Sequence, residues 1–427
     1  MREMKDSGIE WIGEIPNGWN KDKVIRLFEN IGSGTTPKSA DENNYGGDIN
    51  WIQSGDINGE YLISSKNKIF KSVLNNYSAL KIYTAPFIVI AMYGASIGNM
   101  CISQIDACVN QACCVLSNTF LDFKFAFYAF KSTKDYLIQK GLGGGQPNIN
   151  QDIIKQLWLP LPYKNEQKKI ADYLDNKCSK IDEITAKIKI TIDEYKKLKQ
   201  SVITEAVTKG IRPDREMKDS GIEWIGKIPR EWNIVKMKYL GKCRNGLTYS
   251  PDNIVTENGT LVLRSSNIKN GQLDFTDNVF VNCKIKPEFM VKNGDILICS
   301  RNGSRNLIGK NAIISKNLNA SFGAFMMIFR CESSRYVKMI LSSSLFSYYL
   351  GTFLTSTINQ LTAENFNNMK VVYCDDIKEQ QEITNYLDKR CTEIDAVIAK
   401  KEQLVTELEN YKKSLIYEYV TGKMEVI

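Results

Sequence analysis

Basic, amide and hydroxyl residues follow apolar segments in the second half of the sequence. The segment 300–305, Ser-Arg-Asn-Gly-Ser-Arg, begins where the apolar stretch 295–299 ends. A guanidinium group can bond bidentately to a phosphate or to guanine, and an amide offers a base edge both a donor and an acceptor. We therefore expect this part of the chain to contact a nucleic acid. The candidate residues are Arg244, Arg264, Ser265, Arg301, Asn302, Ser304 and Arg305.

The first half of the sequence carries polar residues at matching places. The segment 53–56, Gln-Ser-Gly-Asp, corresponds to 264–267, Arg-Ser-Ser-Asn, and the small, hydroxyl-bearing segment 93–99 corresponds to 300–305. A solvated surface loop explains each short segment equally well, so this alternative stays open for every single residue. The candidate residues here are Thr36, Lys38, Ser54, Ser96, Gln146 and Asn148.

Catalytic, nucleotide and metal sites have little support in the sequence. The glycine-rich segment 141–145 is not followed by Gly-Lys-Ser/Thr, and it follows an expected helix rather than a strand, unlike a phosphate-binding loop. Histidine, the commonest general acid or base and neutral metal ligand, is absent, and the eleven cysteines form no Cys-x-x-Cys pair. We expect no catalytic residue, no metal and no cofactor in this chain.

The net charge of +8 is concentrated in two segments. Residues 21–165 hold 14 Lys and Arg against 11 Asp and Glu, and residues 234–378 hold 18 against 10. A polyanion is the obvious complement, although a moderate net charge also simply keeps a protein soluble. Four acidic residues within 1–20 are unlike a signal peptide, and an odd number of scattered cysteines indicates reduced thiols. We therefore expect a cytoplasmic protein.

The sequence repeats itself after 213 residues. Residues 2–20 return at 215–233 with sixteen of nineteen positions identical, whereas 21–160 and 234–373 share almost nothing. Solenoid and propeller repeats are far shorter, roughly 20–50 residues. We infer one duplicated framework that carries two divergent inserts, each suited to a different target.

Both inserts are expected to be mixed α/β. Segments 121–140 and 334–350 predict helices that come late in each insert, and turn residues separate the apolar segments. The expected strands are 50–53, 86–92, 113–116, 260–263, 295–299 and 325–329.

A heptad pattern follows each insert. No Pro or Gly interrupts it before Gly210 and Gly422, which predicts two helices of roughly 40 residues. Narrow apolar seams are best buried against each other, although each seam could instead pack on its own insert. The seam residues are expected to be Leu174, Ile181, Ile188, Tyr195, Leu387, Ile394, Leu404 and Tyr411.

Conserved-looking segments frame both inserts and carry a family resemblance. Each framework begins with SGIEWIGxIPxxW, and each helix opens with EQxxIxxYLD and closes with SxIxExVT. Over essentially the whole chain this combination resembles the specificity subunit of type I DNA restriction-modification enzymes. The resemblance implies an α+β protein in which two mixed α/β target recognition domains are joined by two long antiparallel helices, a coiled-coil spacer with a pseudo-twofold internal repeat. The implied parts are recognition domains at 1–165 and 211–378 and spacer helices at 166–210 and 379–427.

The resemblance also implies partners. Each recognition domain would bind one half of a bipartite, asymmetric sequence in double-stranded DNA, and the helices would bind two modification subunits. Those subunits would carry S-adenosylmethionine and methylate adenine, and restriction and translocase subunits would then join. The segment 146–149, Gln-Pro-Asn-Ile, resembles a loop frequent late in such domains, whereas the second copy departs with Asn-Gln-Leu-Thr at 359–362.

Two other functions remain alternatives to a non-catalytic DNA-specificity subunit. One is a coiled-coil adaptor whose duplicated domains bind proteins, and the other is a self-contained nuclease or methyltransferase. Salt-sensitive binding to duplex DNA distinguishes a DNA-specificity subunit from an adaptor, because phosphate contacts release counterions. Methyl transfer by the chain alone would instead identify a self-contained methyltransferase.

Overall fold

The computed structural model describes residues 2–141, 148–354 and 359–426. The chain divides into two compact units, of which unit 1 comprises residues up to 188 and from 403 onward, and unit 2 comprises 189–402. Each unit therefore contains one insert, the N-terminal part of one long helix and the C-terminal part of the other. Within the described ranges, no helix combines the length and apolar character needed to cross a membrane.

The framework of unit 1 consists of two antiparallel strand pairs. Strand β1 (Met4–Ile9) pairs with β2 (Gly13–Pro16), and β3 (Asn20–Lys23) pairs with β12 (Trp158–Leu161). Because β12 ends just before helix α6 (Lys164–Lys209) begins, the second pair ties both ends of the insert to this helix.

The insert of unit 1 contains two sheets. All five residues of β8 (Phe87–Ala91) are buried, as expected for a continuous apolar run at the centre of a sheet. The larger sheet has the order β4 (Phe28–Gly32), β11 (Cys113–Thr119), β8, β9 (Met100–Ser103) and β6 (Tyr61–Leu62). The smaller sheet has the order β10 (Ala107–Val109), β5 (Tyr45–Ile52) and β7 (Asn67–Ile69), in which β10 and β5 are parallel.

The segment expected as one helix at 121–140 forms two helices. The Asp122 carboxylate accepts a hydrogen bond of 3.0 Å from the Phe125 amide and so starts the first of them. The chain leaves this helix at Thr133, whose hydroxyl donates to the Phe130 carbonyl at 2.7 Å. The helices of this insert are α1 (Val24–Leu27), α2 (Val73–Asn76), α3 (Phe123–Ser132), α4 (Lys134–Lys140) and α5 (Gln151–Gln156).

Unit 2 repeats this architecture. Its framework pairs are β13 (Met217–Asp219) with β14 (Lys227–Pro229) and β15 (Asn233–Lys236) with β26 (Lys370–Tyr373). One sheet has the order β16 (Gly241–Asn245), β25 (Met326–Cys331), β22 (Ile296–Cys299) and β23 (Asn311–Ile313), which matches β4-β11-β8-β9 of unit 1. The other has the order β17 (Ile254–Val255), β21 (Phe280–Val281), β18 (Thr260–Leu263) and β24 (Ala320–Phe322).

The second sheet also matches its counterpart, because β18 and β24 are parallel just as β5 and β10 are. A hairpin of β19 (Ile268–Lys269) and β20 (Gln272–Leu273) completes the strands. The prediction that both inserts share one mixed α/β fold is therefore confirmed. The helices of this unit's insert are α7 (Met237–Leu240), α8 (Ser334–Ile340), α9 (Ser344–Phe353) and α10 (Ala363–Asn368).

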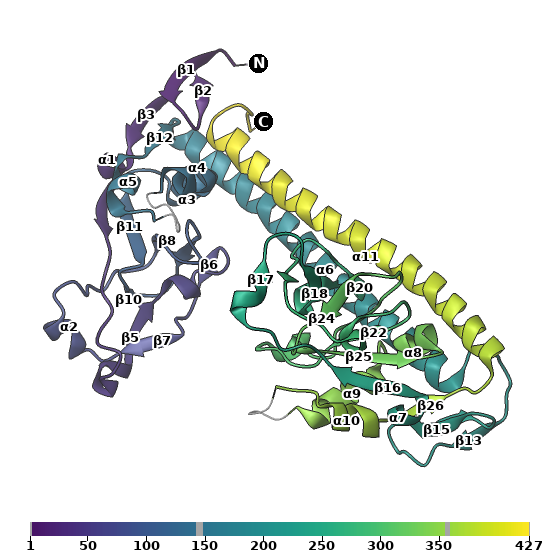
Figure 1. Ribbon diagram of the computed structural model, residues 1–427. Coiled ribbons are helices and arrows are strands. Elements are labelled where there is room, and N and C mark those ends of the chain that lie inside the picture. The colour runs from purple at the N-terminus through teal and green to yellow at the C-terminus, as the bar shows by residue number, and fades with distance from the viewer. Residues whose placement is uncertain (1, 142–147, 355–358, 427) are drawn as a thin grey trace. The chain divides into compact units, whose positions relative to one another are not determined.

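Two long helices, α6 and α11 (Ile377–Val420), join the inserts. They contain 46 and 44 residues, and Gly210 and Gly422 beyond their ends have φ of +77° and +75°, as predicted for C-terminal stops. Within each unit the two helices lie side by side and run antiparallel (Figure 1). In unit 1, Lys412 Nζ lies 2.5 Å from Asp182, and in unit 2, Lys199 Nζ lies 2.6 Å from Asp395. The 213-residue shift relates these two ion pairs, as expected for a pseudo-twofold repeat.

The seam between the helices differs from the expectation at two positions. Leu404 and Tyr411 are 43% and 56% exposed, and the buried residues are Ile398 and Val405. A helix turns by about 100° per residue, so an error of one residue moves a side chain from the seam to its flank. Of the other expected residues, Leu174, Ile181, Leu387 and Ile394 are buried, and Ile188 and Tyr195 are half-buried.

Candidate nucleic-acid interface

Four of the candidate contact residues of unit 2 line one cavity. It has a volume of about 630 Å³, and Arg264, Ser265, Arg301 and Asn302 contribute to its wall. Arg264 comes directly after β18, and Arg301 comes two residues after the end of β22. The ends of strands in two different sheets therefore bring these side chains together.

An arginine and an exposed aromatic ring form a flat surface at this cavity. The Arg301 guanidinium carbon lies 5.4 Å from the centre of the Phe325 ring, and Phe325 is 59% exposed. Nearby, the Asn302 side-chain amide donates to the Ser265 hydroxyl at 3.1 Å. An exposed ring and a guanidinium plane are suited to stacking on a nucleobase.

Two residues that line the cavity carry buried donors without a hydrogen-bond partner among the described residues. Arg264 Nη2 lies 2.9 Å from Asp277 Oδ1, which fixes the guanidinium group. Its Nε and the Ser266 hydroxyl are buried and have no hydrogen-bond partner within the described ranges. Buried polar groups are normally bonded, so these two donors can meet an acceptor only where a local rearrangement exposes them.

Backbone hydrogen bonds position Arg301. Its amide and that of Ser300 donate to the Phe325 carbonyl at 3.1 and 2.9 Å, and Leu361 donates to the Ser300 carbonyl at 2.7 Å. Gln360 pairs with Arg301 in an isolated antiparallel bridge. The segment 359–362, which departs from the family loop in sequence, therefore lies beside the cavity.

The other candidates of unit 2 lie outside the cavity wall. Arg305 Nη2 donates to the Leu354 carbonyl at 3.0 Å, just beyond α9, where a helix C-terminus favours a cation. Arg244 Nη1 lies 3.0 Å from Glu288 Oε1. Ser304 is exposed, and its amide donates to the Asn302 side chain at 3.0 Å. Each of these residues has a local partner.

Unit 1 has the same backbone arrangement with different side chains. The Met92 amide donates to the Ala112 carbonyl, and Ile149 donates to the Met92 carbonyl, both at 2.8 Å. These bonds match those of Ser300 and Leu361, so Tyr93 takes the place of Arg301 and Ala112 that of Phe325. Unit 1 therefore presents no guanidinium-aromatic pair at this position.

The candidates of unit 1 lie on loops at the ends of strands. The Thr36 hydroxyl donates to the Gln111 side chain at 2.5 Å, and the Lys38 amide donates to the Tyr77 hydroxyl at 3.1 Å. Asn148 is exposed. Ser54 follows β5 and Ser96 follows β8, and both are half-buried. Gln146 lies outside the described residues.

Three residues at these positions were not among the candidates. Phe325 was counted as the first residue of a strand, but β25 begins one residue later, and its large exposed ring is the signal that could have identified it. Gln360 and Gln111 are amides in loops that become adjacent to Arg301 and Thr36 only in the folded chain.

The repeated signature residues have a structural role at the start of each long helix. The Trp19 indole donates to Glu166 at 2.9 Å, and Trp232 donates to Glu379 at 3.4 Å. The next residue, Gln167 or Gln380, donates to the carbonyl of Pro162 or Cys374. Burial alone would raise the pKa of Glu379, but the Arg215 guanidinium and the Trp232 indole bond to it and hold the pKa below its ordinary value. We call these contacts the junctions.

Comparisons with known proteins agree with this architecture. Residues 16–194 match the family model of the type I restriction modification DNA specificity domain. The chain is 26% identical over 322 residues to the type I restriction enzyme MjaVIII specificity subunit of Methanocaldococcus jannaschii, an alignment that covers 72% of each chain. It is 29% identical over 211 residues to the EcoKI specificity subunit of Escherichia coli, which covers 47% of this chain and 44% of that protein.

One solved structure shows the same fold. Its title describes complex assembly and conformational transition of the type I R-M system, and it aligns with a TM-score of 0.70 at 15% identity over 96% of this chain and 99% of that one. The signature residues at both junctions indicate type I specificity subunits. The matched domain, the two relatives and the duplicated fold point to the same family. Residues 16–194 match the DNA specificity domain, and the chain as a whole is similar to the specificity subunits of type I restriction-modification enzymes.

Proposed function

We propose that each unit recognises a different half of one bipartite, asymmetric target in double-stranded DNA. In this proposal the recognition domains comprise 1–165 and 211–378, and the chain itself catalyses no reaction. The observation that carries the proposal is that one backbone arrangement presents different side chains in the two units. Arg264, Arg301 and Phe325 in unit 2 stand where unit 1 has Gln53, Tyr93 and Ala112.

The chemistry of the unit 2 cavity supports base recognition. Arg301 is exposed and can present two parallel N–H donors, which match the O6 and N7 atoms of guanine. Asn302 and the neighbouring hydroxyl groups can bond to base edges or to phosphates. In unit 1 the amides of Gln53 and Gln111 and the hydroxyl of Thr36 suit a different half-site.

The long helices, 166–210 and 379–427, are proposed to bind two modification subunits and to act as the spacer. The support is the similarity to specificity subunits and the repeated Lys-Asp pairs that join α6 to α11 in both units. In this arrangement S-adenosylmethionine and adenine methylation belong to the modification subunits. Restriction and translocase subunits would complete the complex in the cytoplasm.

Binding to duplex DNA at several salt concentrations tests the proposal against a protein-binding adaptor. The chain with its modification subunits should bind duplex DNA with an affinity that falls as salt rises. The slope of log K against log [salt] should be about −0.9 for each neutralised phosphate. Binding that does not depend on salt, or no binding to DNA by the complex, would refute DNA recognition.

A helix insertion tests the spacer. We expect that one added helical turn in both 185–195 and 398–408 changes only the number of base pairs between the two half-sites. Both half-site sequences should be kept, because the recognition loops are untouched. Methylation mapping that finds the original spacing would contradict the proposal.

A further inference from the structure

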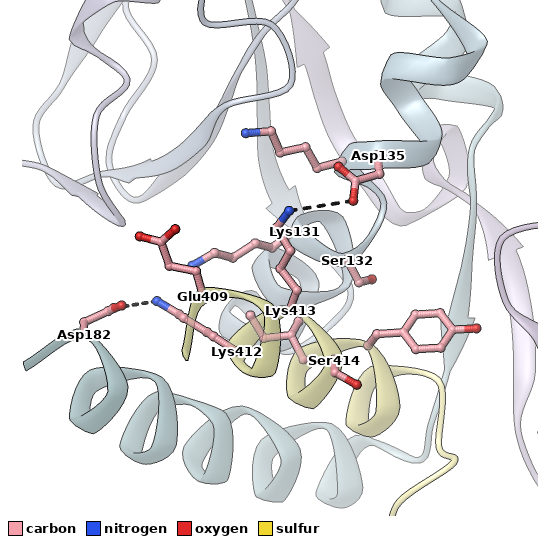
Figure 2. Close-up of a pocket in the computed structure, with 11 residues that line it drawn as sticks. Lys131, Ser132, Asp135, Asp182, Glu409, Lys412, Lys413 and Ser414 are labelled. Carbon is pink, nitrogen blue, oxygen red and sulfur yellow. Dashed lines mark hydrogen bonds and ion pairs between the residues drawn. The ribbon is translucent and has the colours of Figure 1, made fainter. Parts of the chain in front are cut away.

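A half-buried carboxylate joins two lysines in unit 1. Glu60 pairs with Lys131, and its Oε1 also lies 3.0 Å from Lys412 Nζ. Lys412 pairs in addition with Asp182, as Figure 2 shows beside a cavity of about 530 Å³. Burial alone would raise the pKa of Glu60, but the two ammonium groups hold it below its ordinary value. The carboxylate therefore compensates two partly buried cations.

Unit 2 has a matching pair of lysines. Lys199 pairs with Asp395 as Lys412 pairs with Asp182, and the 213-residue shift relates the two pairs. Lys131 of α3 interacts electrostatically with Lys412 and Cys178, and Lys338 of α8 interacts with Lys199 and Cys391. Lys338 is therefore close to the same groups in unit 2 as Lys131 is in unit 1, although the pairs Lys124–Asp175 and Arg335–Asp388 place Lys338 about one turn earlier along its helix.

The bridging carboxylate has no counterpart in unit 2. Asp56 and Asn267 cap equivalent turns, accepting bonds of 2.9 Å from the amides of Gln53 and Arg264. The segment that follows contains Gly59-Glu60 in unit 1 and Gly271-Gln272 in unit 2, where it forms the β19–β20 hairpin, and both glycines have positive φ. A neutral amide therefore stands where unit 1 has Glu60.

A cavity of about 400 Å³ lies at this place, and Lys199, Lys338 and Gln272 line it. The two carboxylates in its wall are already engaged, since Asp395 pairs with Lys199 and Asp388 pairs with Arg335. Within the described part of the chain, Lys338 has no carboxylate at ion-pair distance. Burial, and then the charge of Lys199, lowers the pKa of Lys338, while Asp388 and Asp395 act in the opposite direction.

We propose that the unit 2 cavity binds a small oxyanion, a carboxylate or a phosphate, that bridges Lys338 and Lys199 in the place of Glu60. Such a ligand supplies the negative charge that this position lacks and accepts hydrogen bonds from both ammonium groups and from the Gln272 amide. The site is separate from the candidate DNA interface, because the two cavities have no lining residue in common. The inference goes beyond DNA recognition and does not depend on it.

Thermal unfolding of the full chain tests this proposal. Chloride is replaced at constant ionic strength by inorganic phosphate in one series and by acetate in another, at a pH where Lys338 is charged. A ligand that binds only the folded state raises Tm by mass action, about 3–6 °C at ten times its Kd for a unit of this size. The series with the larger response identifies the preferred oxyanion.

Two reciprocal variants provide the controls. Gln272→Glu supplies the carboxylate from the chain itself, so its Tm without added oxyanion should exceed that of the wild type and should no longer respond. Glu60→Gln makes unit 1 resemble unit 2, so it should lower Tm and add a second oxyanion-dependent increase. Lys338→Gln should abolish the response of unit 2.

An equal response in the wild type, in Gln272→Glu and in Lys338→Gln would overturn the proposal, because the oxyanion would then bind elsewhere, for example at the DNA interface. A wild type that responds to neither phosphate nor acetate would overturn it as well. If Gln272→Glu does not fold, the Lys338→Gln and Glu60→Gln responses still decide the outcome.

Discussion

The loops at the ends of the sheet strands differ between the two units, whereas the junctions do not. At the loops, Arg301 and Phe325 of unit 2 stand where unit 1 has Tyr93 and Ala112, although the backbone hydrogen bonds are the same. At the junctions, by contrast, the same Trp, Glu and Gln side chains make the same bonds. The fold does not depend on the side chains of these loops, so the loops can diverge. The junctions attach the long helices to the inserts, so their side chains are the same in both units.

The junctions themselves differ in burial, and this difference predicts the largest effect. The Glu379 side chain is 4% exposed and its partner Arg215 13%, whereas Glu166 and Arg2 are 18% and 28% exposed. Glu379→Ala should destabilise unit 2 by about 2–4 kcal/mol, because it removes a buried carboxylate that bonds to Arg215 and to the Trp232 indole, although Arg215 keeps its second partner Glu231.

Glu166→Ala is the matched control for that prediction. It should cost only about 1–2 kcal/mol, because Glu166 is more exposed than Glu379. Each arginine keeps a second partner, Glu425 for Arg2 and Glu231 for Arg215. Urea unfolding of both full-length variants measures the difference. Equal losses would show that the burial of the two junctions does not set their strength.

The recognition loops predict an intermediate effect. Arg301→Ala should weaken binding of the complex to its target by about 1–3 kcal/mol and relax the sequence preference at one half-site only. Arg230→Ala removes the same charge from an exposed pair with Glu216 and serves as the control. Competition binding with oligonucleotides mutated in either half-site measures both variants. Equal losses for the two variants would mean that Arg301 contributes only charge.

The helix seam predicts the smallest effect. Val405→Ala should cost about 1–2 kcal/mol, because Val405 is buried between the helices. Leu404→Ala, one residue away on the flank, should change the free energy of unfolding by less than about 0.5 kcal/mol. Chemical denaturation measures the free energy of unfolding of the two variants. A larger loss for Leu404→Ala than for Val405→Ala would show that Leu404, and not Val405, belongs to the packed row.

The sequence predicts the framework well because local patterns determine it. The repeat, the apolar runs of β8 and β22, and the ends of the long helices near Gly210 and Gly422 all appear in the structure as expected. The sequence does not show which residues of α11 are buried at 404 and 405. Leu404 and Val405 are adjacent and both apolar, and only packing determines that Val405 is the buried one.

Side-chain neighbours at the candidate interface could be predicted only in part. Arg264 and Arg301 share a cavity because each follows a buried strand, and that signal is present in the sequence. The exposure of Phe325, the approach of Gln360 to Arg301 and the attachment of Arg305 to Leu354 depend on long-range contacts. No local pattern encodes such contacts.

Mapping of methylated adenines tests most directly whether the two units recognise different half-sites. The chain would be expressed with its modification subunit, once as the wild type and once with residues 300–305 replaced by the structurally equivalent unit 1 segment 92–97. We predict that the replacement alters one half of the methylated sequence and leaves the other half and the spacing unchanged. A change in both halves, or an unaltered target with full methylation, would contradict the account.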